Sequence, residues 1–144
     1  MVGDDRGSQR EVAHELEELL AQQPRTGLRN ALLRVGPVSP NEAPSVLAPM
    51  AAAVERMVRS GDGVSPGAAD DVLVLLRGVH DIPVALAVAR KICSAAGEVA
   101  PAVAGVTLIN RGESATSALV RARGAFDLAR EAGAGQVISS PLWP

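Results

Sequence analysis

Aromatic side chains are almost absent from this sequence of 144 residues. Phe126 and Trp143 are the only two, and there is no tyrosine, so aromatic residues make up 1% of the chain. Proteins that bind single-stranded nucleic acid stack the bases on aromatic side chains and follow the backbone with a positive groove. The formal net charge of −2 supplies no positive excess. These absences exclude a nucleic-acid partner and require a core of aliphatic residues and alanine.

Cysteine, lysine and long apolar runs are scarce as well. Cys93 is the single cysteine, which excludes an internal disulfide and a thiolate-rich zinc site. No run of about 18 apolar residues occurs, so we expect no membrane insertion. The first ten residues lack the apolar segment of a secretory signal, which favours a cytoplasmic protein. Lys91 is the only lysine among 14 basic residues, and with the abundant alanine this suggests a bacterial source.

The length and the 47% hydrophobic content are typical of one globular domain. We expect a flexible lead-in over residues 1–9, a single domain over residues 10–139 and a tail over residues 140–144. A domain of this size can bury a core without a disulfide or a metal.

Helical and strand patterns alternate along this domain. They predict helices over residues 10–22, 41–60, 81–95 and 114–132, strands over residues 28–35, 72–76, 103–109 and 136–139, and a short hairpin strand around Val64. Ser39 and Glu42 fit a capping box for the second helix, and Asp81 fits an N-cap for the third. Gly105 indicates a bulge or a close backbone approach. The order predicts an α/β fold in which helices cover a central, mainly antiparallel sheet of ferredoxin-like type.

One segment of the chain resembles a known signature. The five residues before the apolar strand 73–76 are similar to the hairpin of the bacterial GGDEF domains, which make cyclic di-GMP from two GTP. Residues 103–107, 122–130 and 133–137 resemble the family's later strand, helix and chain end, so the resemblance covers about residues 10–139. It implies the cyclase-palm fold of a degenerate GGDEF, or diguanylate cyclase-like, domain. The degenerate signature consists of Ala68, Ala69, Asp70, Asp71 and Val72.

Departures from the family pattern imply that the cyclase chemistry is lost. Ala68 and Ala69 replace two glycines that let the backbone approach GTP, because glycine has no Cβ. Residues 35–38 read Val-Gly-Pro-Val where the family has L-D-x-D, whose aspartates hold two divalent cations. The substrate segment that follows in the family has no counterpart here. We therefore expect no enzyme activity, and no Mg²⁺ or other cofactor at the degenerate site.

Asp70 and Asp71 keep two carboxylates at the signature. One of them should face the covered side of the strand, so a capping or turn role is the favoured interpretation. Arg130 stands where a lysine of the family contacts phosphate, which preserves the charge and changes the donor geometry.

The segment from Arg59 to Asp62, followed by five residues and Ala68, matches the R-x-x-D of the family's product-inhibition site. Arginine can donate two hydrogen bonds to guanine O6 and N7 or to a phosphate, and aspartate can accept from guanine N1 and N2. The same residues also suit a helix end without a ligand, because a cation in the last turn and a glycine cap are favourable there. Arg59 and Asp62 are candidate cyclic di-GMP ligands, and a purely structural role stays open.

Two functions therefore stay open. The first is a catalytically inactive GGDEF-like regulatory domain that binds cyclic di-GMP through Arg59 and Asp62 and signals to a protein partner. The alternative is a protein–protein interaction or dimerisation module that binds no nucleotide. A partner protein or a homodimer is expected in both. His14 and His80 lack partners at metal-binding spacing, and Cys93 is interpreted as a small packed residue.

Overall fold

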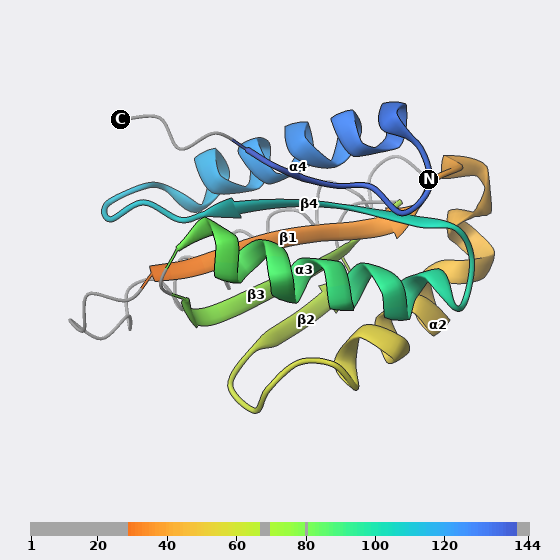
Figure 1. Ribbon diagram of the computed structural model, residues 1–144, viewed down its shortest axis with the longest axis horizontal. Coiled ribbons are helices and arrows are strands. Elements are labelled where there is room, and N and C mark those ends of the chain that lie inside the picture. The colour runs from red at the N-terminus through yellow and green to blue at the C-terminus, as the bar shows by residue number, and fades with distance from the viewer. Residues whose placement is uncertain (1–28, 67–69, 80, 141–144) are drawn as a thin grey trace.

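The computed structural model describes residues 29–66, 70–79 and 81–140, so the expected first helix, His14, His80, Ala68 and Ala69 lie outside the described residues. In chain order the elements are β1 (Arg29–Pro37), the 3-10 helix η1 (Pro40–Glu42), α2 (Ala43–Glu55), β2 (Gly63–Pro66), β3 (Val72–Val79), α3 (Ile82–Gly97), β4 (Ala102–Leu108), α4 (Ala115–Ala132) and β5 (Val137–Ser139). The strands form one sheet of order β2-β3-β1-β4-β5 with helices on both faces (Figure 1).

The sheet is mainly antiparallel, as the sequence predicts. β1 lies in its centre and pairs antiparallel with β3 and with β4, while β5 joins β4 in parallel at one edge. β1 is buried from its second residue to its last because it has a strand on each side and helices above and below. The residues of β1 therefore set the positions of the helices that pack on both faces of the sheet.

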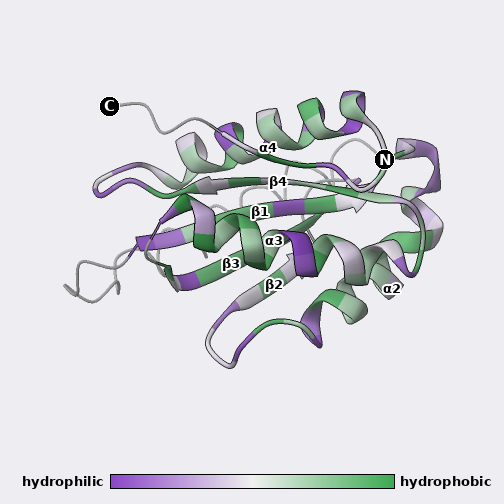
Figure 2. Cartoon of the chain, viewed as in Figure 1, coloured by the Kyte–Doolittle hydropathy of each residue, from purple (hydrophilic) through white to green (hydrophobic). Residues whose placement is uncertain are grey.

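Alternate residues of β1 point to different helices. Leu33 and Val35 join the core beneath α2 and α3, whereas Leu32 joins the core beneath α4. Arg34 follows the same alternation and faces the α4 side, where the chain buries a polar residue. Figure 2 shows a hydrophilic band across β1 before its arrowhead.

Two expectations about the second helix are wrong. The chain first makes the 3-10 turn η1, and the Ser39 side chain makes no capping hydrogen bond, so the expected capping box does not form. Pro40 and Pro44 lack backbone N–H groups and delay the regular helix to Ala43. The helix also ends at Glu55, where a short-range bond from Met57 N–H to the Val54 carbonyl tightens the last turn. Arg59 consequently lies in the turn beyond the helix.

Other expectations are confirmed. Asp81 caps α3 by accepting a hydrogen bond from Val84 N–H at 3.0 Å. Gly133 ends α4 with φ of 111°. A Cβ on Gly105 would lie 2.2 Å from the backbone nitrogen of Phe126, so α4 rests directly on β4 at that point. Among the described helices, none is long and apolar enough to cross a membrane.

Candidate functional site

Asp70 and Asp71 lie just before β3, beside the last residues of β1. A Cβ built on Gly36 would come within 2.7 Å of the Asp70 carbonyl oxygen and 3.3 Å of the Asp71 Cα. The end of β1 and the segment before β3 are therefore in direct contact. No side chain fits at Gly36 without moving this backbone, which leaves no space there for a metal-binding carboxylate.

Three arginines meet these two aspartates on the α4 face of the sheet. The group is called the arginine–aspartate cluster below and consists of Arg34, Asp70, Asp71, Arg123 and Arg130. Arg34 comes from β1, the aspartates precede β3, and the other two arginines come from α4. The cluster thus joins three elements that are distant in sequence.

Asp71 forms the buried half of the cluster. Its side chain is 0% exposed, and its Oδ2 accepts hydrogen bonds from Arg34 Nη1 at 2.8 Å and from Arg123 Nη1 at 3.1 Å. Arg34 is itself almost fully buried. Arg34 and Asp71 therefore each need the other as a counter-ion, because a buried charge without one is strongly disfavoured.

Asp70 forms the outer half. Arg123 donates to its two carboxylate oxygens at 2.6 and 3.1 Å, in the forked geometry typical of strong arginine–carboxylate pairs. Arg130 adds a bond to Oδ2 at 2.7 Å and one to the Asp70 carbonyl at 3.2 Å. The Arg130 Nε also donates to the Pro37 carbonyl at 3.0 Å, which ties α4 to the end of β1.

Phe126 lies beneath the two α4 arginines. The guanidinium carbons of Arg123 and Arg130 are 5.1 and 4.5 Å from the centre of its ring, within the range of cation–π interactions. The ring is fully buried. Phe126 therefore contacts both guanidinium groups, each of which also pairs with Asp70.

The electrostatics of the cluster favour its charged form. Hydrogen bonds from Arg123 outweigh the effect of burial and, with those from Arg130, lower the pKa of Asp70 from 3.8 to about 2. The same pairing raises the pKa of Arg123 above its ordinary value. The described residues contain no group of three His, Cys, Asp or Glu side chains that could hold a metal ion. The places beside the carboxylates where a cation would bind are taken by guanidinium groups.

Sequence reasoning singled out three of the five cluster residues, namely Asp70, Asp71 and Arg130. Asp71 does face the covered side of the strand, but the capping or turn interpretation left out the arginines that pair with both aspartates. Arg34 and Arg123 were missed as site residues. A charged residue inside an otherwise apolar strand was the available signal for Arg34.

Arg59 and Asp62 lie together in the turn between α2 and β2. The Asp62 side chain is 4% exposed, and its carboxylate accepts hydrogen bonds from the backbone N–H groups of Arg59 at 3.1 Å and Arg77 at 2.9 Å. The Arg59 side chain is 67% exposed, and its Nη2 donates to the Arg77 carbonyl at 2.5 Å. Gly61 has φ of 98°, but α2 has its C-cap at Arg56, so the expectation that Gly61 caps this helix is wrong and the glycine lies in the turn beyond it. The pair is therefore preformed, with Asp62 inside and Arg59 outside.

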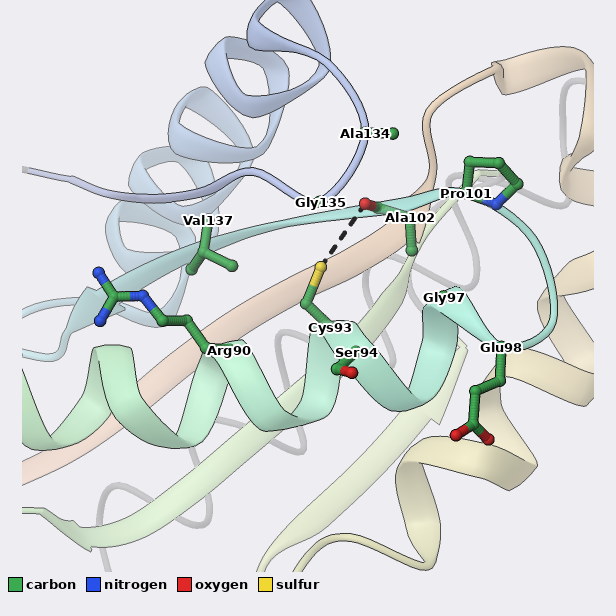
Figure 3. A pocket seen from close by; sticks show the side chains of 10 residues that line it. All are labelled: Arg90, Cys93, Ser94, Gly97, Glu98, Pro101, Ala102, Ala134, Gly135 and Val137. Atoms are coloured by element: carbon green, nitrogen blue, oxygen red, sulfur yellow. Dashed lines mark hydrogen bonds between the residues drawn. The ribbon is translucent and has the colours of Figure 1, made fainter.

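A cavity of about 550 Å³ lies on the α3 side of the sheet, opposite α4. It is placed between the end of α3 and the turn before β5 (Figure 3). Cys93 lies at this cavity and donates a hydrogen bond to the Ala102 carbonyl at 3.6 Å. Burial raises the pKa of its thiol to about 11. The thiol is therefore protonated at neutral pH and unsuited to nucleophilic chemistry, in agreement with its interpretation as a packed residue.

No protein-family model and no curated protein matches the sequence. Solved structures do match. The chain is similar to an EAL/GGDEF domain protein from M. capsulatus, with 23% identity and a TM-score of 0.73 over 88% of this chain and 94% of that one. It is also similar to the GGDEF domain of YfiN from Pseudomonas aeruginosa, with 18% identity and a TM-score of 0.78 over 93% and 90% of the two chains.

A third similar structure is the GGDEF domain of DgcB from Caulobacter crescentus in complex with c-di-GMP, with 14% identity and a TM-score of 0.74. The match covers 92% of this chain and 90% of that one. The five-stranded sheet with its flanking helices is thus the cyclase-palm fold of GGDEF domains, and the fold implied by the signature resemblance is confirmed.

Proposed function

We propose that this chain is a catalytically inactive GGDEF-like regulatory domain of the bacterial cytoplasm. The observation that carries the proposal is the arginine–aspartate cluster. The two carboxylates of the degenerate signature, those of Asp70 and Asp71, form ion pairs with three guanidinium groups. These pairs occupy the oxygens that a divalent cation would need.

A metal ion would have to break these pairs before it could bind. Mg²⁺ requires oxygen ligands in nearly octahedral geometry, and Asp70 already uses both carboxylate oxygens on Arg123 and Arg130. The positive charges of the arginines would also repel an incoming cation at close range. β1 contains no Asp or Glu, and Gly36 is in contact with the backbone before β3, so this strand offers no additional carboxylate. The GTP-activating chemistry of the family therefore has no support here.

The test is an assay for cyclase products. The full chain is incubated with GTP and either Mg²⁺ or Mn²⁺, and pyrophosphate and cyclic di-GMP are measured beside an active diguanylate cyclase. We expect neither product above the level of a sample without protein. Product that depends on the chain and disappears in Asp70→Asn would overturn the proposal.

We propose further that the regulatory ligand is cyclic di-GMP, bound at Arg59. The exposed Arg59 guanidinium is supported by the Arg77 carbonyl and keeps other donors directed to solvent. Asp62 holds the turn that presents it, so its main role is to position Arg59. The Caulobacter GGDEF domain of the same fold was solved with c-di-GMP, which makes this ligand the first to test.

Isothermal titration calorimetry with cyclic di-GMP tests this ligand. We expect Arg59→Ala to weaken binding by about tenfold or more, since it removes a charge-assisted donor pair. Arg56→Ala is the matched control, because Arg56 is an exposed arginine just after the same helix. Equal affinity in Arg59→Ala and the control, or no heat in the unmodified chain, would show that Arg59 and Asp62 serve only the fold.

A further inference from the structure

The Asp62 carboxylate is turned inward and is already bound by the chain itself. Its side chain is only 4% exposed. Oδ1 accepts a hydrogen bond from the backbone N–H of Arg77 at 2.9 Å, and Oδ2 accepts one from the backbone N–H of Arg59 at 3.1 Å. A guanine base could reach this carboxylate only if both backbone N–H groups lost their acceptor, which is costly for partly buried groups.

Arg59 meets solvent at the same place. Its Nη2 donates to the Arg77 carbonyl, and its Nε lies 3.5 Å from Asp62 Oδ2 on the inner side. Within the described residues, Arg59 Nη1 makes no hydrogen bond, so the outer edge of the guanidinium group is open to a ligand. Arginine can pair in a forked geometry with guanine or with a phosphate. Arg59 alone therefore does not decide which part of a nucleotide is bound.

Arg77 adds a second positive charge beside Arg59. Its backbone N–H is bound by Asp62 and its carbonyl by Arg59, so the two arginines start from neighbouring backbone positions. Arg77 is exposed, and in the part of the chain that the structure describes its side chain makes no ion pair. One buried carboxylate cannot balance two guanidinium groups. The positive charge that remains attracts a phosphate and gives little to an uncharged base.

We propose that the site at Arg59 binds the phosphodiester groups of a cyclic dinucleotide without reading its bases, and that Arg77 is a second phosphate-binding residue. This inference rests on the proposed binding of cyclic di-GMP at Arg59 and narrows what is recognised there. Cyclic di-AMP carries the same two phosphodiester groups and differs only in its purines. Since the carboxylate that could read guanine is buried, the two dinucleotides should bind with dissociation constants within about threefold of each other.

Calorimetry of the full chain with each dinucleotide tests the inference. A side chain that reads a base by paired hydrogen bonds contributes about tenfold or more to discrimination. A preference of that size for cyclic di-GMP would overturn the inference and leave the proposed function standing. Binding of neither dinucleotide would remove the proposed function, and the inference with it. The two failures therefore give different results.

Arg77→Ala tests the second arginine. Asp62 binds the backbone of this residue, so the variant keeps the hydrogen bonds of the turn and loses only the guanidinium group. It should weaken both dinucleotides by the same factor, about threefold or more. Arg56→Ala is the control, because Arg56 is an exposed arginine nearby whose backbone makes no bond to Asp62. A loss no larger than that of the control would exclude Arg77 as a ligand residue.

Asp62→Asn separates positioning of Arg59 from recognition of a base. If Asp62 only holds the turn, the affinities for cyclic di-GMP and cyclic di-AMP should fall together and their ratio should stay the same. Sodium chloride should likewise lower both affinities by one factor, because it screens the same phosphate contacts. A loss confined to cyclic di-GMP in Asp62→Asn would show that this carboxylate reads guanine and would overturn the inference.

Discussion

Arginine and aspartate meet at two places in this fold, and the two places use them in opposite ways. In the arginine–aspartate cluster the guanidinium groups turn inward, and Asp71 is completely buried beneath them. In the turn after α2 the aspartate is again inside, but Arg59 projects outward with most of its side chain in solvent. The arginines at the first place pair with buried or half-buried carboxylates, whereas the Arg59 side chain at the second place is 67% exposed.

This difference shows that the same two residue types can be buried at one place of a fold and partly exposed at another. Asp70 and Asp71 keep the acidic character of the signature, yet both are paired with arginines. Arg59 and Asp62 match a short motif, and only Arg59 is presented to solvent.

The largest effect should come from Asp71→Ala. Removal of this carboxylate leaves Arg34 as a buried cation without its counter-ion, so the free energy of unfolding should fall by about 3–5 kcal/mol. Urea denaturation measures this change. Asp127→Ala is the control, because Asp127 pairs with Arg123 from a mainly exposed position and its loss should cost no more than about 1 kcal/mol. Equal losses of unfolding free energy in Asp71→Ala and Asp127→Ala would show that the buried ion pair is worth no more than the exposed one.

Asp62→Ala should have the next largest effect. It leaves the backbone N–H groups of Arg59 and Arg77 without their acceptor, which should cost about 1–3 kcal/mol of unfolding free energy. Arg59→Ala, measured in the same way, should cost less because its side chain is largely in solvent. A larger loss for Arg59→Ala than for Asp62→Ala would reverse the roles assigned to the two residues.

The pH dependence of stability should single out Asp70. Its pKa in the folded state is about 2 against an ordinary value of 3.8, because Arg123 and Arg130 stabilise the ionised form. The stability that it contributes is therefore fully present above pH 3.8 and is lost as the pH falls toward 2. Thermal midpoints of the unmodified chain and Asp70→Asn should differ at neutral pH and converge across this range. A gap that stays constant down to pH 2 would contradict the ion pairing.

Divalent cations should produce the smallest effect of all. A ligand present at about 100 times its dissociation constant stabilises a protein by roughly 2.7 kcal/mol, which thermal unfolding detects easily. We expect millimolar Mg²⁺ and EDTA to give the same thermal midpoint, because the cluster already satisfies both carboxylates. A higher thermal midpoint in Mg²⁺, absent in Asp70→Asn, would show that Mg²⁺ binds Asp70 in place of the arginines.

The fold was predictable where local patterns are strong. The apolar run of β3, the Asp81 cap of α3 and the final Gly133 of α4 each mark an element by its own residues. The second helix was predicted too long, because the tight turn at its end depends on packing rather than on a sequence break. The 3-10 turn η1 at Pro40 likewise replaced the expected capping box.

The cluster could be predicted only in part, because its partners are set by tertiary structure. Arg34 meets Asp71 through the pairing of β1 with β3, and Arg123 meets it because Gly105 lets α4 lie close to the sheet. Neither relation is visible in a local pattern. The buried state of Asp62 was missed for the same reason, since its partner Arg77 is on β3.

The cluster also has a consequence for the order of folding. Its hydrogen bonds join residues that are 37, 53, 60 and 93 positions apart. Contacts over such separations require the closure of long loops and tend to form late, after local helices and hairpins. Interactions absent from the transition state act mainly on the unfolding rate. The arginine–aspartate cluster is therefore expected to slow the unfolding of the domain more than it speeds its folding.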